Sequence, residues 1–187
     1  MRIRDVKTLS DKRYKLSEYA FDYRRGDGTW QHQHREVFDR GHAAAVLPID
    51  PARGTVILVR QFRLPAHLSG HTAPLVEAIA GALDGDAPED CARREAMEEA
   101  GVEVSELECV FHCFMSPGAV TERMHLFVGR YSAASRTAEG GGLRDEGEDI
   151  EVLELPLARA LEMAANGEIC DAKTIMLLQW AAMNERY

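Results

Sequence analysis

The sequence has little that would tie it to a membrane, to nucleic acid or to an oxidising compartment. It has only four cysteines, none in a CxxC pair, so a disulfide framework is not expected. No stretch approaches the roughly 18 apolar residues of a membrane helix, and the residues after Met1 lack the apolar run of a signal peptide. Acidic residues outnumber basic ones by 31 to 22, which argues against the basic face of a non-specific nucleic-acid binder. We therefore expect a soluble, cytoplasmic protein.

Length and composition describe an ordinary globular chain. The 187 residues are 45% hydrophobic and 28% charged, with a formal net charge of −9. This length favours one domain with a small attachment, and it allows a core without disulfides or a structural metal. The negative charge still permits a phosphate ligand, because a metal ion can bridge an acidic protein to an acidic ligand.

Alternating apolar residues and turn signals predict a chain rich in strands. The predicted strands are 14–24, 29–38, 43–49, 55–62, 75–80, 107–115, 124–131 and 151–155. The predicted helices are 88–100, 157–165 and 172–184, of which the first begins at a proline and ends before Gly101. The glycine-rich segment 133–149 is predicted to be a mobile surface loop. This order predicts an α+β sandwich of helices on a mixed sheet.

The segment 88–100 carries an unfavourable charge pattern. On a helix, Glu95, Glu98 and Glu99 fall within an arc of about 100°, so their carboxylates repel one another. Two of them also lie in the last turn, where the helix dipole favours cations. An oxygen-seeking ion such as Mg²⁺ would remove both penalties. The other interpretation is a solvated acidic face, in which Arg94 pairs with Glu98 four residues further on.

Around these residues the sequence resembles the Nudix box, whose usual pattern is G-x5-E-x7-R-E-U-x-E-E-x-G-U, with U aliphatic. Residues 94–102 match the second half of the pattern, with Ala96 at the first aliphatic position. The first half is one residue shorter than usual: Asp86 takes the acidic position, Ala80 falls at the glycine position and Gly81 follows it. The likeness covers nearly the whole chain, from about residue 9 to residue 180.

Further stretches are similar to the ADP-ribose pyrophosphatase branch of the Nudix hydrolases, and within it to the GDP-mannose pyrophosphatase subgroup. They are 34–41, 61–63, 77–81, 80–89, 115–122, 148–156 and 171–174. The resemblance implies a Nudix-type α/β/α sandwich with a mixed β-sheet over residues 42–187. It also implies an N-terminal β-hairpin region over residues 1–41 that is exchanged in a dimer.

The same resemblance implies an enzyme that hydrolyses the pyrophosphate bond of a nucleoside diphosphate sugar. The first choice of substrate is GDP-mannose, cleaved to GMP and mannose 1-phosphate with Mg²⁺, or with Mn²⁺ in its place. An ADP-ribose pyrophosphatase and a non-catalytic nucleotide-sugar sensor are the alternatives.

Roles for individual residues follow from the resemblance as well. The implied metal ligands are Glu95, Glu98, Glu99, Glu148 and the backbone carbonyl of Ala80. Arg94 would hold these carboxylates in place. The implied catalytic residues are Glu99, Glu148 and Glu122. Either Glu148 or Glu122 would be the base; we favour Glu148 as ligand and base, and Glu122 as a contact to substrate or water.

Substrate phosphates need cations outside the metal site. The implied substrate contacts are Arg35, Arg63, Glu122 and Lys173. The resemblance places Arg35 and Arg63 on the neighbouring subunit of a homodimer with shared active sites. Ordinary surface charges are the alternative interpretation of Arg35 and Lys173, and an exposed turn residue that of Glu122.

Overall fold

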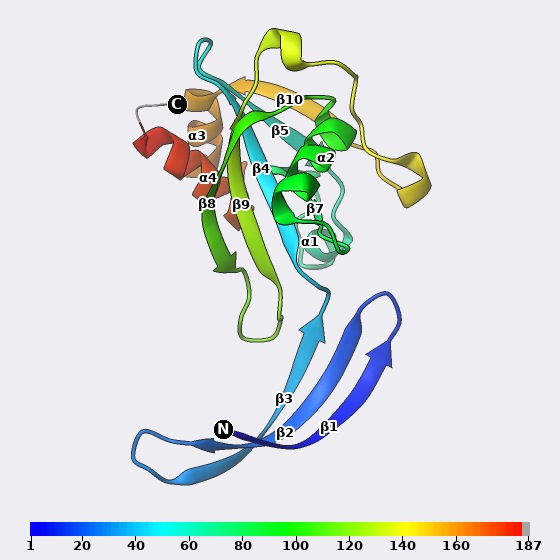
Figure 1. The fold of residues 1–187 in the computed structure, drawn as a ribbon, viewed down its shortest axis with the longest axis vertical. Helices are drawn as coiled ribbons and strands as arrows, with labels where there is room; N and C mark the ends of the chain where they lie inside the picture. Colours follow the sequence, from blue (N-terminus) through cyan, green and yellow to red (C-terminus); the bar gives the residue numbers. More distant parts are fainter. Residues whose placement is uncertain (185–187) are drawn as a thin grey trace. The chain divides into compact units, whose positions relative to one another are not determined.

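The computed structural model describes residues 1–184, which divide into two units (Figure 1). The smaller unit contains Met1–His42 and Cys113–Arg123, and the larger unit contains Ala43–His112 and the chain from Met124 onward. A three-stranded sheet forms the smaller unit and a seven-stranded sheet underlies the larger one.

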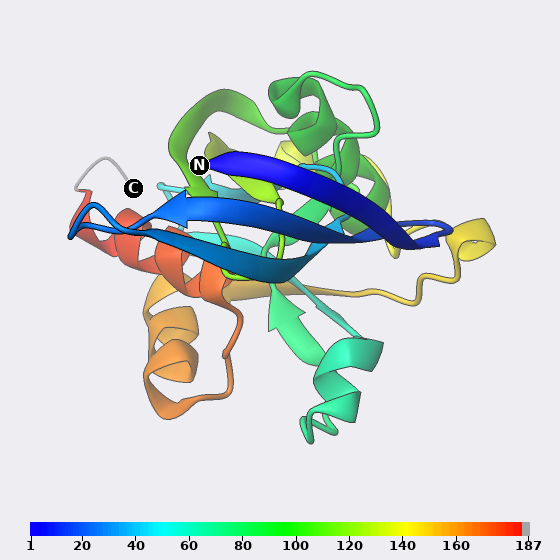
Figure 2. The same ribbon diagram turned by 90° about the horizontal axis from the view of Figure 1, so that it is seen from below.

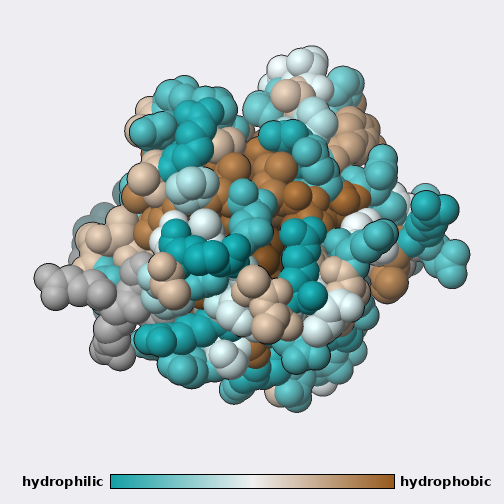
Figure 3. Space-filling view, turned by 90° about the horizontal axis from the view of Figure 1, so that it is seen from above, coloured by the Kyte–Doolittle hydropathy of each residue, from teal (hydrophilic) through white to brown (hydrophobic). Residues whose placement is uncertain are grey.

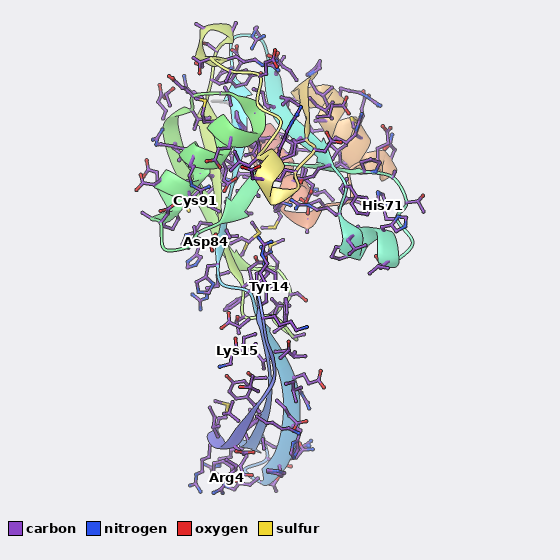
Figure 4. The ribbon with its side chains drawn as sticks, turned by 90° about the vertical axis from the view of Figure 1, so that its right-hand side faces the viewer. Arg4, Tyr14, Lys15, His71, Asp84 and Cys91 are labelled. Atoms are coloured by element: carbon purple, nitrogen blue, oxygen red, sulfur yellow. The ribbon has the colours of Figure 1, made fainter. Side chains whose placement is uncertain are left out.

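The sheet of the smaller unit is antiparallel. Its strands are β1 (Arg2–Asp11), β2 (Lys15–Arg24) and β3 (Trp30–Asp39). β2 and β3 form the predicted hairpin, and the Asp27 carboxylate holds its turn by accepting hydrogen bonds from the backbone and the hydroxyl of Thr29. Figure 4 labels Tyr14 and Lys15 at the β1–β2 turn, with Arg4 towards the other end of the sheet.

The sequence analysis predicts a single hairpin in the N-terminal region, whereas the structure has a three-stranded sheet, because β1 was not predicted. Its apolar residues Ile3, Val6 and Leu9 are spaced by three, whereas a regular strand repeats every two residues. The register of β1 against β2 shifts twice, once between Ile3 and Asp5 and once between Thr8 and Ser10. Each bulge inserts an extra residue, which hides the alternation that identifies a strand.

The larger unit is built on a mixed sheet whose main strands lie in the order β10-β5-β4-β9-β8. Its strands are β4 (Ala43–Asp50), β5 (Thr55–Gln61), β6 (Leu75–Glu77), β7 (Ile79–Ala82), β8 (Ser105–Phe114), β9 (Arg123–Arg130) and β10 (Glu151–Pro156). β4 runs parallel to β9 and antiparallel to β5 and β7, which confirms the predicted mixed sheet. The predicted strand 75–80 is in fact two strands, because β6 pairs with β5 whereas β7 pairs with β4.

Helices cover both faces of this sheet. They are α1 (Leu64–Leu68), α2 (Pro88–Ala100), α3 (Leu157–Asn166) and α4 (Ala172–Met183). α2 lies on one face, and α3 and α4 lie on the other (Figure 2), so the predicted α/β/α sandwich is confirmed. α2 begins and ends where the sequence predicts, and Gly101 closes it with a left-handed φ of 64°. α1 is absent from the predicted helices, because its five residues are too few to show a helical period.

One part of the core of the larger unit lies between the sheet strands β4 and β5 and the helix α2. Every residue of β4 is buried, and α2 packs on the sheet through Ala92, Ala96 and Ala100, each at most 1% exposed. Small side chains let the helix lie close to the sheet. As a result, the glutamates that flank this alanine stripe are carried into the protein rather than into open solvent.

Hydropathy varies across the surface of the molecule. On the face shown in Figure 3, hydrophobic residues gather in the middle and hydrophilic residues surround them. Two short 3₁₀ turns, η1 (Ala133–Ser135) and η2 (Arg144–Glu146), lie in the connection between β9 and β10. Within residues 1–184, none of the helices is long and apolar enough to cross a membrane.

Candidate active site

α2 carries the acidic residues that the sequence singles out. It follows a tight turn in which Asp84 has a φ of 47°, and Figure 4 labels Asp84 in this turn and Cys91 on the helix. Glu95 and Glu99 are buried one helical turn apart, and Glu98 is partly exposed between them. The predicted helix therefore does bring the three carboxylates together.

Arg94 ties part of this group together. Its Nη1 donates to Glu95 Oε1 at 2.8 Å and to Glu98 Oε2 at 3.1 Å. Its Nε donates to Asp86 Oδ2 at 3.2 Å. Burial alone would lower the pKa of Arg94, but these neighbouring carboxylates raise it instead. The predicted holding role of Arg94 is confirmed for Glu95 and Glu98, and the shortened loop still brings Asp86 to the arginine.

Glu99 is the most buried of the acidic residues, at 1% exposure. Burial, followed by the charge of Glu95, raises its pKa to about 8. The backbone N–H of Ala80 on β7 donates to Glu99 Oε2 at 3.2 Å. Next to it, a Cβ added at Gly81 would collide with the Glu95 carboxylate. The Ala80–Gly81 backbone therefore lies directly against the carboxylates of α2.

Glu148 joins this group from the connection between β9 and β10. Burial is the main cause of the raised pKa of Glu95 and Glu99, and the charge of Glu148 contributes to both shifts. Its Oε2 accepts a hydrogen bond from the backbone N–H of Leu143 at 2.8 Å. Gly142 packs against it so closely that an added Cβ would lie 2.5 Å from the same oxygen.

Glycines of this connection cap the C-terminus of α2. The N–H of Gly141 donates to the carbonyl of Glu99 at 2.9 Å, and that of Gly142 to the carbonyl of Glu98 at 3.1 Å. Gly140 has a φ of 74°, and a Cβ there would lie 2.6 Å from the Glu99 carbonyl oxygen. The prediction of a mobile loop does not include this cap, although three consecutive glycines were the available signal. Its mobility stays a prediction.

A second group of charges is centred on Glu77, at the end of β6. Its Oε2 accepts from Arg63 Nε at 2.7 Å, and its Oε1 accepts from Lys173 Nζ at 2.7 Å. Lys173 Nζ also lies 3.0 Å from Asp171 Oδ2. The structure thus brings together two predicted substrate contacts, Arg63 and Lys173, around a carboxylate to which the sequence analysis gave no role. A glutamate within a short apolar strand was the signal for it.

Arg63 also connects the two groups. Burial would lower its pKa, but the Glu77 carboxylate raises it, and the charge of Glu99 acts in the same direction. Arg63 therefore lies within electrostatic range of Glu99 in its own chain. That Arg63 serves the site of a neighbouring subunit stays a prediction.

Known families match both parts of the chain. The family described as "GDP-mannose pyrophosphatase NudK N-terminal domain" matches residues 1–38, and the NUDIX domain matches residues 39–178. The chain belongs to the Nudix family. In the matched region, the Nudix helix is α2.

Curated Nudix relatives are similar over almost the whole chain. Proteins named GDP-mannose pyrophosphatase are 49% identical in Pectobacterium atrosepticum, covering 95% of this chain and 91% of that protein, and 46% identical in Escherichia coli, covering 95% and 93%. A solved structure titled "Crystal structure of ADP compounds hydrolase" superposes with a TM-score of 0.72, covering 97% of this chain and 91% of that one. At 21% identity, this second likeness concerns the Nudix fold alone.

Nudix hydrolases generally need a divalent metal ion. The side chains of Glu95, Glu98, Glu99 and Glu148 offer only oxygen donors, which suit Mg²⁺ or Mn²⁺. As they stand, each accepts a hydrogen bond from a nitrogen of the chain, and no three His, Cys, Asp or Glu side chains among residues 1–184 already converge as a metal site. The donor set fits the ion by its chemistry, since a cation would relieve the crowded negative charge.

Two predicted site residues belong to the smaller unit. Glu122 is buried and forms an ion pair with Arg40 at 2.8 Å. Arg35 is exposed, and its Nη1 donates to the backbone carbonyl of His34 at 2.7 Å. Contact of Glu122 or Arg35 with the Nudix helix stays a prediction.

Proposed function

We propose that this Nudix enzyme hydrolyses the pyrophosphate bond of GDP-mannose to give GMP and mannose 1-phosphate. The observation that carries the proposal is the 46–49% identity, over 93–95% of the chain, to curated proteins named GDP-mannose pyrophosphatase. The intact carboxylates of α2 favour hydrolysis over a non-catalytic sensor, because a sensor would not need to keep a buried group of like charges.

Mg²⁺ is the proposed cofactor, with Mn²⁺ able to take its place. The proposed ligands are Glu95, Glu98, Glu99, Glu148 and the carbonyl of Ala80. When bound, the ion neutralises negative charge on the pyrophosphate oxygens. The raised pKa of Glu95 and of Glu99, caused by burial and then modified by neighbouring charges, supports a cation at this place.

The residues of the chain supply the rest of the reaction. Glu148 is the proposed base that orients and deprotonates the attacking water. Its Oε2 accepts from the N–H of Leu143, and its Oε1, which accepts no hydrogen bond among the described contacts, is the proposed proton acceptor. Glu122 is the proposed contact to substrate or water, and Glu99 is proposed to act at the reacting phosphate together with the metal. Phosphoryl transfer depends chiefly on such positioning and charge neutralisation.

Cations of the chain bind the substrate phosphates in this proposal. Two of them are Arg63 and Lys173, and their shared hydrogen bonds to Glu77 support a joint role. Arg35 is the proposed third cation, contributed like Arg63 by the neighbouring subunit. Lys173 would come from that subunit as well, because Glu77 holds it beside Arg63 in the same chain. Arginine suits this task because its planar guanidinium donates two parallel hydrogen bonds to a phosphate.

The proposed assembly is a cytoplasmic homodimer with shared active sites and no nucleic-acid or membrane partner. Residues 1–41 would form the exchanged N-terminal region and residues 42–187 the Nudix hydrolase domain. The matched families meet between residues 38 and 39, which supports this division. Support for the dimer comes from β1, where Ile3, Val6 and Leu9 are 40–54% exposed. Exposed apolar residues along a strand favour a protein partner.

Product analysis tests the proposed reaction. GDP-mannose, GDP-glucose and ADP-ribose are incubated with the enzyme, with and without Mg²⁺, and the products are separated by chromatography. We expect metal-dependent formation of GMP and mannose 1-phosphate, with the highest kcat/KM for GDP-mannose. A preference for ADP-ribose would retain the chemistry and refute the substrate, and no hydrolysis by folded, metal-loaded enzyme would refute the proposed function.

A further inference from the structure

We propose that Glu77 is a positioning residue that holds Arg63 and Lys173 in the arrangement in which they bind the phosphates of the substrate. The inference rests on the proposed function and deepens it. Glu77 itself would touch neither the substrate nor the metal.

The first argument is the geometry of the carboxylate. Glu77 uses one oxygen for Arg63 Nε and the other for Lys173 Nζ, both at 2.7 Å. Its side chain is 5% exposed and that of Lys173 is 9% exposed, so little water competes for these charged hydrogen bonds. A single buried carboxylate thereby sets the distance between two cations.

The second argument is that hydrogen bonds fix the elements that carry these residues. Arg63 precedes α1, Glu77 ends β6 and Lys173 lies in the first turn of α4. Asp171 caps α4 by accepting from the backbone N–H of Thr174 at 3.0 Å and from its hydroxyl at 2.6 Å. The hydroxyl oxygen of Thr174 also accepts from the backbone N–H of Ala78, the residue after Glu77, at 2.7 Å. The backbone beneath Glu77 and Lys173 is therefore held, and Glu77 then restricts the flexible ends of the two cationic side chains.

The third argument is what this arrangement leaves available. Glu77 occupies the Nε of Arg63, and within residues 1–184 neither terminal guanidinium nitrogen has a described hydrogen bond. The arginine side chain is 40% exposed, so these nitrogens can reach a ligand. Lys173 has three N–H donors, and its Nζ lies within hydrogen-bond distance of two carboxylates, those of Glu77 and Asp171. One donor is left for a ligand. Ordering such long side chains beforehand lowers the entropy cost of binding a phosphate.

The substitution Glu77→Gln tests the proposal with almost no change of shape. A glutamine oxygen can accept from one cation, but its NH₂ group then faces the other. We expect KM for GDP-mannose to rise about 10-fold to 100-fold while kcat changes less than about threefold. The Mg²⁺ concentration for half-maximal activity should stay unchanged. Glu151→Gln is the matched control, because it removes an exposed carboxylate that pairs with Arg60 at 2.8 Å and should leave KM unchanged.

Two kinetic outcomes overturn the inference. A lower melting temperature with unchanged KM would make Glu77 merely structural, and a large loss of kcat with unchanged KM would make it a catalytic residue. Binding of GDP-mannose to both proteins by calorimetry in EDTA separates this inference from the proposed function. An enzyme that hydrolyses nothing would refute the function, whereas equal Kd values for the wild type and Glu77→Gln would refute the role of Glu77.

A double-mutant cycle keeps the proposal testable if Glu77→Gln does not fold. Arg63→Gln, Lys173→Gln and the double variant are compared by the same binding measurement. If Glu77 couples the two cations, losing either one frees the other. The factor by which the double variant raises Kd should then fall short of the product of the two single factors by more than about threefold. Multiplicative effects would show independent cations and overturn the proposal.

Discussion

Replacing Glu99 by glutamine should stabilise the metal-free protein while removing its activity. In the folded chain, burial and the charge of Glu95 raise the pKa of Glu99 to about 8, above its ordinary value of 4.5. The folded state therefore holds a proton that the unfolded state has lost, and the free energy of unfolding falls as pH rises from about 4.5 to about 8. A glutamine carries no charge, and its oxygen can still accept from the N–H of Ala80.

The size of the effect follows from the pKa difference. At pH 7.5, three units above the ordinary value, keeping Glu99 protonated in the folded state while the unfolded chain ionises it costs up to about 4 kcal/mol. Allowing for relaxation around the carboxylate, Glu99→Gln should gain about 2–4 kcal/mol, which corresponds to about 5–15 °C in Tm for a chain of this length. At pH 5 the gain should shrink below about 1 kcal/mol, because the unfolded chain then keeps part of its protons as well.

Thermal unfolding in EDTA, followed by circular dichroism from pH 5 to pH 9, measures this difference. The Tm of the wild type should fall with rising pH more steeply than that of Glu99→Gln. Adding Mg²⁺ should raise the Tm of the wild type and have less effect on the variant, which has lost one proposed ligand. Glu103→Gln, which changes an exposed glutamate just beyond α2, is the control and should follow the wild type.

Two results would refute the reasoning. One is a Glu99→Gln protein that is less stable than the wild type in EDTA at pH 7.5. The other is the same pH dependence of Tm in both proteins, which would mean that folding does not change the pKa of Glu99. Full hydrolytic activity in the variant would separately refute the assignment of Glu99 as a metal ligand.

Three further predictions concern the backbone and the assembly. Gly81→Ala should displace the Glu95 carboxylate, since the new Cβ would collide with it. We expect kcat/KM to fall about 100-fold or more and Tm to fall by a few degrees. Unchanged kinetics would contradict the close packing. Gly140→Ala should cost about 1–3 kcal/mol in denaturant unfolding, because its φ of 74° and the Glu99 carbonyl both oppose a side chain. Mixing Arg63→Ala with Glu99→Gln protein should restore about a quarter of wild-type activity if dimers share their sites, and no recovery after verified subunit exchange would count against sharing.

Local spacing explains why α2 could be predicted so closely. The positions of Pro88 and Gly101 mark the ends of the helix through backbone rules that act within one turn. The grouping of Glu95, Glu98 and Glu99 follows from the helical period alone. Contact of Arg94 with Glu95 and Glu98 is equally local, since it spans one and four residues.

β1 shows where pattern reasoning fails within a single element. Its apolar residues Ile3, Val6 and Leu9 are three residues apart in the sequence, a spacing that matches neither a regular strand nor a complete helical stripe. The strand forms all the same, because two bulges interrupt its pairing with β2. The register of the pairing is a property of two strands together. It could be found only from the structure of the sheet.

The sequence by itself determined the acidic helix, its boundaries, the mixed sheet with its helices and the resemblance to the Nudix family. The tertiary structure decided that Glu77 joins Arg63 to Lys173, the latter 96 residues away, and that glycines before Glu148 close the end of α2. The physical reason is the range of the interactions. Helical periods and caps depend on neighbouring residues, whereas the meeting of β6, α4 and the glycine segment depends on how the whole chain packs.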